Sequence, residues 1–535
     1  MTVNPSLILH QMPRKRRRPL IPFGGELVPD RYVPPHFLFI GTTNSGKTLS
    51  VRMVLQACLA ENGQLLGRCM IYDAKKEYLP MLTGMRVPLD HIHIMNTADR
   101  RCSAWDMARD IKSRDDASNI MTLLIPDDGK GRDNPFFPQG VRSLVTEVMM
   151  TLHTSSPNKW RLKDVVDALR TPARLQSLLR QTQRGREVCE RYFTSAKEAV
   201  GGIISTIDAR FISIYDTISE IWSKAERSVS LTTDWVTGHS AILLGYDANR
   251  AGIDRINQVI FQRAAQLAMS LPEGAGEKFG ESFFVLDEIR YFGNAPMLGE
   301  AASFGRTKGL RFIFAPQDLD GMYTVFGEHL AHEIIGLCGN VGVFRLDSVK
   351  TREWAGKFFG EYEAWEKDFG GSTSISHGTT EGAGGTSTNT STSVTSSWNK
   401  RIMKREAILP SEFMHLPVPS PAHGMEGFFA TPSMGAWRAA IHPHFVNAHL
   451  PHDDPNTPPF EPRVEVQPEP LPQKPLLPAV ESELTLLDHQ AEAETPEAAA
   501  DSELGNEPNR LPGSTIEEKK PKKRTKKPKG RLPEW

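Results

Sequence analysis

The sequence has little cysteine and no long hydrophobic run. Its 535 residues include five cysteines, none in a C-x-x-C pair. This argues against a zinc site or a disulfide framework and fits a reducing compartment. No stretch approaches the roughly 18 consecutive apolar residues of a membrane-spanning helix, and no apolar segment follows the first basic cluster, as a secretory signal requires. We therefore expect a cytoplasmic protein without a transmembrane segment.

The chain also lacks a charge excess of either sign. Its 63 Lys and Arg residues nearly balance 64 Asp and Glu residues, so bulk charge indicates no class of partner. The charges are unevenly distributed, however. Basic clusters occur at 14–18 and 519–531, and 481–507 carries acids without a Lys or Arg. The last basic cluster is suited to nucleic acid or to an anionic membrane surface.

Short, nearly continuous apolar runs recur along the chain, as is typical of parallel strands buried on both faces. Helical patterns separate some of them, for example over 252–271 and 297–307. This alternation predicts a doubly wound α/β fold with a mainly parallel sheet. The predicted strands are 36–40, Cys69–Asp73, His91–Met95, Ala241–Tyr246, Phe283–Asp287, Phe312–Ala315 and Val341–Leu346.

Between residues 105 and 232 helical periodicity replaces this alternation, which predicts an inserted all-α domain. The α/β domain would then consist of 35–104 and 233–447. A group of arginines with no acid among them lies in the predicted insertion. It fits either a solvated helix face or a surface that follows a nucleic-acid backbone. The group comprises Arg170, Arg174, Arg180, Arg184 and Arg186.

Three segments are expected to lack a packed core. Residues 1–34 are basic and Pro-rich and should form an extended arm. Residues 370–398 are almost entirely Ser, Thr and Gly, which predicts a flexible loop. Residues 448–535 are Pro-rich, then acidic, then basic, which predicts a disordered tail.

The stretch 41–48 reads G-x-x-x-x-G-K-T, between a strand-like run and a helical pattern. This context is typical of a Walker A loop, whose backbone N–H groups surround a phosphate at a helix N-terminus. Lys47 would reach the β- and γ-phosphates of ATP, and the Thr48 hydroxyl would bind Mg²⁺. The alternative is a Gly-rich turn before a helix. The predicted nucleotide-binding residues are Gly41, Thr42, Thr43, Asn44, Ser45, Gly46, Lys47 and Thr48.

An apolar strand that ends in Asp287 and Glu288 fits a Walker B element, although other strand ends give similar patterns. Asp287 would hold Mg²⁺, and Glu288 would be the general base for water. Gln317 follows another apolar strand, where α/β sheets bind ligands. It would contact the γ-phosphate or water, or cap the next turn. Arg306 either complements a helix dipole or reaches across a subunit boundary as an arginine finger.

These motifs, in this order, resemble the TraG/TraD/TrwB-type coupling proteins of type IV secretion and conjugation. The similarity runs over about residues 35–445 and includes 73–77 and 315–317. It implies a RecA-like P-loop ATPase of the FtsK/HerA type. Such motors form hexameric rings, hydrolyse ATP at subunit interfaces, and move DNA or deliver protein substrates to a secretion channel. The catalytic residues that it implies are Lys47, Asp287, Glu288, Gln317 and, acting on a neighbouring subunit, Arg306.

Typical members of this family carry N-terminal transmembrane helices, and this sequence shows none. We therefore expect a form that partners, such as a relaxase or secretion-channel proteins, dock at the inner membrane. The acidic stretch 481–507 is either a docking segment of the kind that such tails provide or a solubilising tail. Two other functions stay open. One is a cytoplasmic FtsK/HerA-like DNA translocase for packaging, processing or defence, and the other is a nucleotide-gated substrate adaptor with little turnover.

Overall fold

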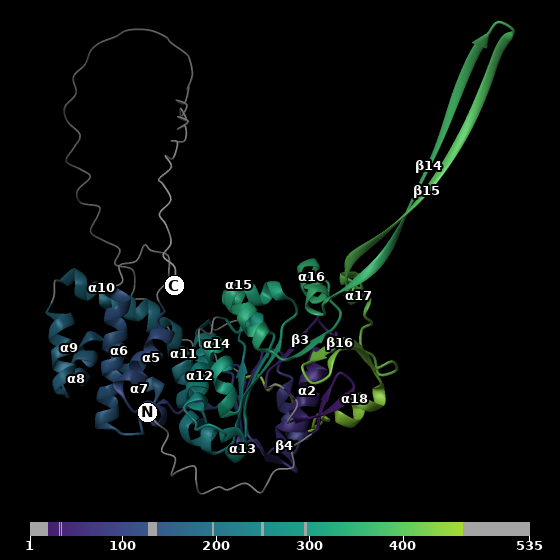
Figure 1. Ribbon diagram of the computed structural model, residues 1–535. Coiled ribbons are helices and arrows are strands. Elements are labelled where there is room, and N and C mark those ends of the chain that lie inside the picture. Colours follow the sequence, from purple (N-terminus) through teal and green to yellow (C-terminus); the bar gives the residue numbers. More distant parts are fainter. Residues whose placement is uncertain are drawn as a thin grey trace, which may run out of the picture. The chain divides into compact units, whose positions relative to one another are not determined.

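The computed structural model describes residues 20–30, 33, 35–126, 136–194, 197–247, 251–293 and 297–463. Its centre is a nine-stranded sheet in the order β17-β16-β13-β3-β12-β11-β6-β10-β7 (Figure 1). Seven strands are parallel, and β16 and β17 extend one edge antiparallel. All seven predicted strands belong to the parallel part, which confirms the α/β fold. The strands are β3 (Phe37–Ile40), β6 (Arg68–Asp73), β7 (Ile92–Met95), β10 (Ala241–Gly245), β11 (Ser282–Asp287), β12 (Leu310–Ala315), β13 (Asn340–Val343), β16 (Met425–Thr431) and β17 (Gly435–Ile441).

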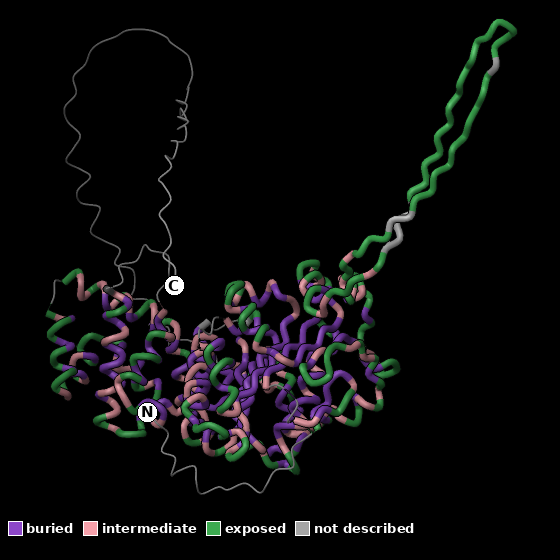
Figure 2. The backbone as a smooth tube through the Cα atoms, viewed as in Figure 1, coloured by how far each residue is buried: buried purple, intermediate pink, exposed green. Residues whose placement is uncertain are grey.

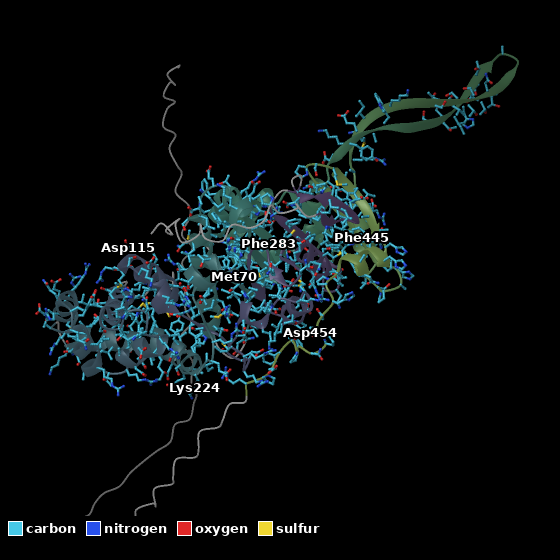
Figure 3. All side chains as sticks on the ribbon, turned by 90° about the horizontal axis from the view of Figure 1, so that it is seen from below. Met70, Asp115, Lys224, Phe283, Phe445 and Asp454 are labelled. Atoms are coloured by element: carbon cyan, nitrogen blue, oxygen red, sulfur yellow. The ribbon has the colours of Figure 1, made fainter. Side chains whose placement is uncertain are left out.

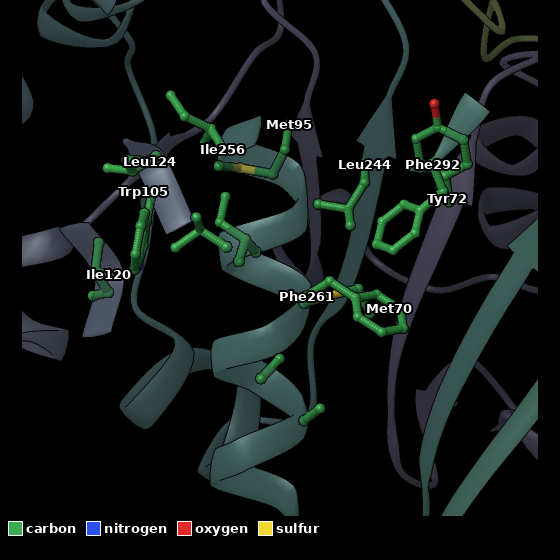
Figure 4. Close-up of a cluster of buried hydrophobic side chains, with 14 of the residues drawn as sticks. Met70, Tyr72, Met95, Trp105, Ile120, Leu124, Leu244, Ile256, Phe261 and Phe292 are labelled. Carbon is green, nitrogen blue, oxygen red and sulfur yellow. The ribbon is translucent and has the colours of Figure 1, made fainter. Parts of the chain in front are cut away.

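The apolar runs are continuous because both faces of the sheet are covered. Along β11, Phe283 and Val285 enter one hydrophobic cluster, and Phe284 and Leu286 enter the other. One face packs against α2 (Lys47–Cys58) and α3 (Tyr78–Gly84), the other against α12 (Ala251–Met269) and α14 (Leu298–Phe304). Phe261 of α12 lies beside the sheet residues Met70 and Leu244 (Figure 4). The sheet is thus the middle layer of three.

Helices fill the chain between two short strands, β8 (Ala104–Trp105) and β9 (Ser228–Val229). These strands pair with each other, so the chain enters and leaves the helical part at adjacent positions. The larger hydrophobic cluster is continuous from the sheet into these helices. They are α4 (Met107–Asp110), α5 (Arg114–Leu124), α6 (Phe136–Ser155), α7 (Leu162–Leu169), α8 (Pro172–Leu179), α9 (Gln183–Phe193), α10 (Lys197–Ile207), η3 (Asp208–Ile212) and α11 (Ser213–Ser223).

Further helices and short strands complete the sheet domain. They are β4 (Ala60–Glu61), β5 (Gln64–Leu65), η2 (Leu89–His91), η4 (Leu231–Thr237), α13 (Ala275–Phe279), η5 (Ile289–Tyr291), η6 (Gly305–Lys308), α15 (Leu319–Leu337), α16 (Val349–Phe358), α17 (Pro410–His415) and α18 (Pro443–His449). Among the described residues, no helix combines the length and apolar character needed to span a membrane.

The prediction of a flexible loop over 370–398 is wrong. The segment lies within a hairpin of two 22-residue strands, β14 (Glu361–Gly382) and β15 (Gly385–Glu406). A two-stranded ribbon needs no core, because its backbone groups satisfy one another across the strand pair. Cross-strand hydroxyl contacts add to the pairing, as between Ser374 and Ser393 at 2.7 Å and Ser376 and Ser391 at 2.8 Å. Figure 2 shows the exposed hairpin.

The described part of the predicted N-terminal arm also differs from the expectation. A hairpin forms from β1 (Leu20–Phe23) and β2 (Glu26–Pro29). Its turn glycine, Gly24, accepts a hydrogen bond from Trp437 Nε1 at 3.0 Å, and Phe23 packs edge-on against the Phe429 ring. A few aromatic and apolar side chains are therefore sufficient to anchor this segment to the sheet domain. Residues 1–19 lie outside the described part of the chain.

The folded region does not end near residue 447 as predicted. Residues 450–463, which we call the strap, run on as irregular chain held by backbone hydrogen bonds. Asp454 N donates to Pro80 O at 2.9 Å, and Arg463 N donates to Ala98 O at 2.8 Å. Figure 3 labels Asp454 on this segment. Ion pairs join Asp453 to Arg52 and Glu461 to Arg100. The prolines of the strap favour an extended backbone, which can form hydrogen bonds with the sheet domain. The remainder of the predicted tail lies outside the described residues.

Candidate nucleotide-binding site

The loop 41–48 connects β3 to α2 at the carboxyl end of the strand. Gly46 has φ 110° and directly precedes the helix, and Asn44 has φ 59°. This left-handed backbone favours glycine. A Cβ on Gly41 would lie 2.5 Å from Ser45 Oγ and 2.8 Å from Phe344 Cβ, so the loop is also too tight for a side chain there. The result is a closed turn that leads into the N-terminus of a 12-residue helix, which is the form of a phosphate cradle.

The Lys47 side chain is buried inside this turn. Its Nζ donates hydrogen bonds to Gly41 O at 2.5 Å and to Thr42 O at 2.8 Å. Burial, and to a lesser extent the nearby Lys75 ammonium, lower the pKa of Lys47 to about 8, while Asp287 and Glu288 oppose the shift. The amino group is therefore fixed at the mouth of the loop beside the two predicted acids.

The structure brings Thr48 and Asp287 together. The Thr48 hydroxyl donates to Asp287 Oδ2 at 3.2 Å, and the buried Tyr78 hydroxyl donates to the same oxygen at 3.1 Å. The other oxygen, Asp287 Oδ1, is buried without a hydrogen-bond partner. A buried carboxylate oxygen without a partner is costly unless a cation satisfies it. This oxygen and the Thr48 hydroxyl are hard oxygen ligands of the kind that Mg²⁺ prefers, so the residues fit a magnesium site.

Glu288 occupies a strained position directly after β11. Its φ of 69° lies in the left-handed region, which costs a residue with a Cβ about 1–2 kcal/mol. Gln317 Nε2 donates to Glu288 Oε2 at 2.9 Å, and Lys75 Nζ lies 3.8 Å from the same oxygen. Gln317 therefore lies at the site and contacts Glu288, as its place after β12 indicated.

Arg306 lies apart from these residues. It is exposed on η6, before β12 begins, whereas Gln317 follows the end of that strand. Six residues of strand span about 20 Å at ~3.3 Å per residue, so Arg306 lies at the amino edge of the sheet and cannot reach the site of its own chain. There it lines a cavity of about 600 Å³ with His36 and Pro432.

Sequence reasoning did not assign a role to three site residues that the structure supplies: Asp73, Lys75 and Tyr78. Asp73 ends β6 directly opposite Asp287 in the strand register. Burial raises the pKa of Asp73 to about 6, although the backbone amides of Glu77 and Tyr78 donate to its carboxylate. The sequence contained a signal for Asp73, because this residue also comes at the carboxyl end of a buried apolar strand.

Comparison with known proteins places this arrangement in a family. The family model of the type IV secretion-system coupling protein DNA-binding domain matches residues 22–433. Coupling protein TraD of Escherichia coli (strain K12) is 22% identical over 331 residues, which cover 61% of this chain and 44% of TraD. The chain therefore matches less than half the length of this curated relative.

Solved structures of the conjugative coupling protein TrwB share the fold. Its unbound monoclinic form, TrwBdeltaN70, has a TM-score of 0.57 and 16% identity, covering 84% of this chain and 92% of that one. A TrwB complex with ADP and Mg²⁺ has a TM-score of 0.58 and 17% identity, with coverages of 84% and 94%. A TrwB complex with the ATP analogue ADPNP has a TM-score of 0.58 and 16% identity, with the same coverages.

Proposed function

Because the chain belongs to the family of the type IV secretion-system coupling protein DNA-binding domain, we propose that it is an ATP-hydrolysing motor. In this proposal it couples DNA, or a nucleoprotein substrate, to a type IV secretion or conjugation channel. The observation that carries the proposal is the grouping at the carboxyl edge of the sheet. Beside the buried Lys47, Thr48 bonds to Asp287 and Gln317 bonds to Glu288. A pure nucleotide binder needs neither a general base nor a group that orients it.

Each residue has a specific task in ATP hydrolysis. The 41–48 loop and Lys47 hold the phosphates, while Thr48 and Asp287 would hold Mg²⁺. When bound, Mg²⁺ neutralises charge on the phosphate oxygens. Glu288 takes a proton from the water that attacks the γ-phosphorus, as the bond to the ADP oxygen breaks. Gln317 holds the Glu288 carboxylate in position through its 2.9 Å hydrogen bond.

We assign Arg306 to the site of a neighbouring copy. The residue lies at the opposite sheet edge from its own Walker residues and is exposed. A contact that joins opposite edges of two copies is heterologous, and such contacts form a ring when the rotation between copies closes. This supports sites at interfaces between copies, where the Arg306 guanidinium stabilises charge on the transferred phosphoryl group. We propose that the ring is a homo-hexamer.

The proposed nucleic-acid contact lies on the helices inserted between β8 and β9. Arg174 of α8 and Arg184 of α9 are exposed, as are the nearby Arg180 and Arg186. Arg170 differs, because it forms ion pairs with Asp167 and Asp216. The other four arginines are exposed, and their positive charges are suited to contact with a phosphate backbone. We propose that a relaxase or channel proteins dock the motor at the cytoplasmic face of the inner membrane.

The test is ATPase activity of the full chain at rising protein concentration, with single-stranded DNA, duplex DNA or none. We expect DNA to stimulate turnover and specific activity to rise with concentration as rings form. Lys47→Ala and Glu288→Gln should abolish hydrolysis, and Glu288→Gln should still bind ATP. An absence of turnover at every concentration with both DNA forms would refute the motor and favour a nucleotide-gated adaptor.

A matched pair of variants tests the Arg306 assignment. Arg306→Ala should retain ATP binding and lose hydrolysis, whereas Lys308→Ala, which removes a cation from the same short helix, should keep both. Equal losses in the two variants would show that the positive charge of this helix, rather than the Arg306 guanidinium, matters.

A further inference from the structure

Within the part of the chain that the structure describes, the β14–β15 hairpin is a long exposed element that the proposed chemistry does not use. Each strand has 22 residues, which corresponds to about 70 Å at ~3.3 Å per residue. Every described residue from 370 to 397 is exposed. The pairing register runs without interruption from Glu361 opposite Glu406 to Gly382 opposite Gly385. The ribbon therefore presents two long edges, and half of the backbone N–H and C=O groups of each strand point outward from the pair.

Over the outer part of the hairpin, these edges lack the devices by which proteins prevent strand addition. Such devices are prolines, inward-pointing charges and bulges. Between Gly370 and Thr380, and between Thr386 and Ser397, the strands contain no proline, lysine, arginine or carboxylate. The continuous register also excludes a bulge. An edge of this kind is a template for another strand.

The two strands carry opposite charge. β14 has five carboxylates and one lysine, and β15 has four lysines and arginines and one carboxylate. Most of these charges lie near the base of the hairpin, with Glu361 and Glu363 on one strand and Lys404 and Arg405 on the other. Two β14 edges would repel each other, and so would two β15 edges. The favourable contact joins the acidic edge of one copy to the basic edge of another.

The faces of the ribbon are also distinct. Trp365 lies opposite Ile402, and Ile375 and Val394 fall on the same face by the register. Their side chains are 69%, 50%, 60% and 73% exposed. The other face presents Ser374 opposite Ser393 and Ser376 opposite Ser391. If two hairpins pair edge to edge in the matching register, their apolar side chains stay on one face of the combined sheet and their serines stay on the other.

We propose that the hairpin pairs edge to edge with the hairpin of a second copy of this chain, acidic β14 of one against basic β15 of the next. This head-to-tail contact leaves one acidic and one basic edge free at the ends of any open row. A ring of copies therefore joins the hairpins into a closed β-tube with no free edge. The inference takes only the ring from the proposed function, and it does not depend on ATP hydrolysis.

Charge reversal tests the pairing by complementation. Variant A carries Glu361→Lys and Glu363→Lys, and variant B carries Lys404→Glu and Arg405→Glu. Each variant alone places like charges at every contact between hairpins, so native mass at low salt should detect rings only at higher protein concentration than for the native chain. A one-to-one mixture should restore assembly, because the basic β14 of A meets the acidic β15 of B and the acidic β14 of B meets the basic β15 of A. The like charges within each hairpin are the same in the mixture as in the single variants, so restored assembly can come only from contacts between copies. A mixture that assembles no better than either variant alone would overturn the proposal.

Cysteine cross-linking tests the orientation. One copy carries Ser374→Cys in β14, and a differently tagged copy carries cysteine at Asn389, Ser391, Ser393 or Thr395 in β15. The five native cysteines are buried and do not compete. We expect disulfides between the two tags at one or two β15 positions, and none within either variant alone. Homodimers of one variant would indicate a two-fold contact and refute head-to-tail pairing.

The outcomes separate the hairpin from the motor. Rings with ATPase activity but without cross-links would overturn the tube and leave the proposed motor intact. Cross-links without ATPase activity would support the tube and refute the motor. Flotation of the chain with liposomes of phosphatidylethanolamine and phosphatidylglycerol, without cross-links, would assign the hairpin to a lipid surface and overturn the proposal. Replacing 364–403 by Asn-Gly should abolish flotation if the hairpin is the lipid contact.

Discussion

At the scale of single residues, the adjacent acids Asp287 and Glu288 have different surroundings, because their side chains point in different directions where β11 ends. Asp287 belongs to β11 and receives hydrogen bonds from Thr48 and Tyr78, with one oxygen left without a partner. Glu288 has already left the strand through a left-handed backbone and meets Gln317 instead. The turn thus directs one carboxylate towards the proposed metal position and the other towards the proposed water.

The lowered pKa of Lys47 predicts a pH dependence of nucleotide binding. Burial holds this pKa at about 8, so the free protein carries the charged form below that pH and loses it as the pH rises. Phosphate favours the charged form. The Kd for ATP should therefore be nearly constant below pH 8 and rise above it, by up to about tenfold per pH unit. Titration with a fluorescent ATP analogue from pH 6.5 to 9.5 would measure this. Lys47→Gln, which has no proton to lose, should bind weakly at every pH without this change.

The strained Glu288 backbone predicts opposite effects on stability and activity. Glu288→Gly removes the side chain that opposes a positive φ, so it should unfold at a higher temperature than Glu288→Gln, by about 1 kcal/mol in stability. Neither variant should hydrolyse ATP. Thermal unfolding of both proteins would measure the difference. Equal midpoints would show that the surrounding structure, rather than the backbone angle, limits stability at this position.

At the scale of elements, the structure orders segments whose composition indicated disorder. Backbone hydrogen bonds between its two strands hold the β14–β15 ribbon, and hydrogen bonds to the sheet domain hold the strap. The strap lies close to the nucleotide site, because Phe460 lies under the Lys76 ammonium at 3.5 Å and lines a small cavity with Asp73. Asp453 pairs with Arg52 of α2, the helix that begins at Lys47. The strap therefore contacts both the P-loop helix and the carboxyl edge of the sheet.

Packing of the strap against α3 predicts a glycine-specific effect. A Cβ on Gly84 would lie 1.8 Å from the His452 carbonyl oxygen, so Gly84→Ala should detach the strap. Limited proteolysis should then cleave 450–463 faster than in the native chain. Gly336→Ala in α15 is the control, because a Cβ there would have no atom within 4 Å. That substitution should leave cleavage unchanged and stabilise the helix by up to ~1 kcal/mol. Native-like proteolysis of Gly84→Ala would show that the strap is held elsewhere.

At the scale of the whole molecule, the proposed catalytic groups lie on two opposite edges of one sheet. Lys47, Asp287, Glu288 and Gln317 lie at the carboxyl edge, and Arg306 lies at the amino edge. A single chain cannot bring them together across about 20 Å of strand. An assembly in which one copy presents its amino edge to the carboxyl edge of the next would complete every site except those at an open end.

This division predicts complementation between two inactive variants. Lys47→Ala lacks the phosphate contact but presents an intact Arg306, and Arg306→Ala has the reverse defect. In a random one-to-one mixture, roughly a quarter of the interfaces pair an intact loop with an intact arginine. The mixture should therefore regain ATPase activity that neither variant shows alone. A mixture as inactive as its components would place Arg306 outside the trans site.

The sequence by itself determined the parts that depend on neighbours along the chain. The seven buried strands follow from apolar runs, because strands covered on both faces leave no polar alternation. The phosphate loop follows from residues 41–48, because its form is set within a single turn. The core of the proposed site could therefore be predicted, because each of its residues lies at the end of a strand or the start of a helix. These residues are Lys47, Thr48, Asp287, Glu288 and Gln317.

Only the tertiary structure decided which distant residues meet. Strand order places Asp73 beside Asp287, and α3 directs Tyr78 to the same carboxylate, although about 210 residues separate them in the chain. It also places Arg306 on the edge opposite Gln317, although they are close in sequence, because a strand runs between them. The hairpin and the strap were missed for the same physical reason. Their order comes from backbone pairing with a partner segment, and composition records how much apolar surface a segment can bury, not which segment it pairs with.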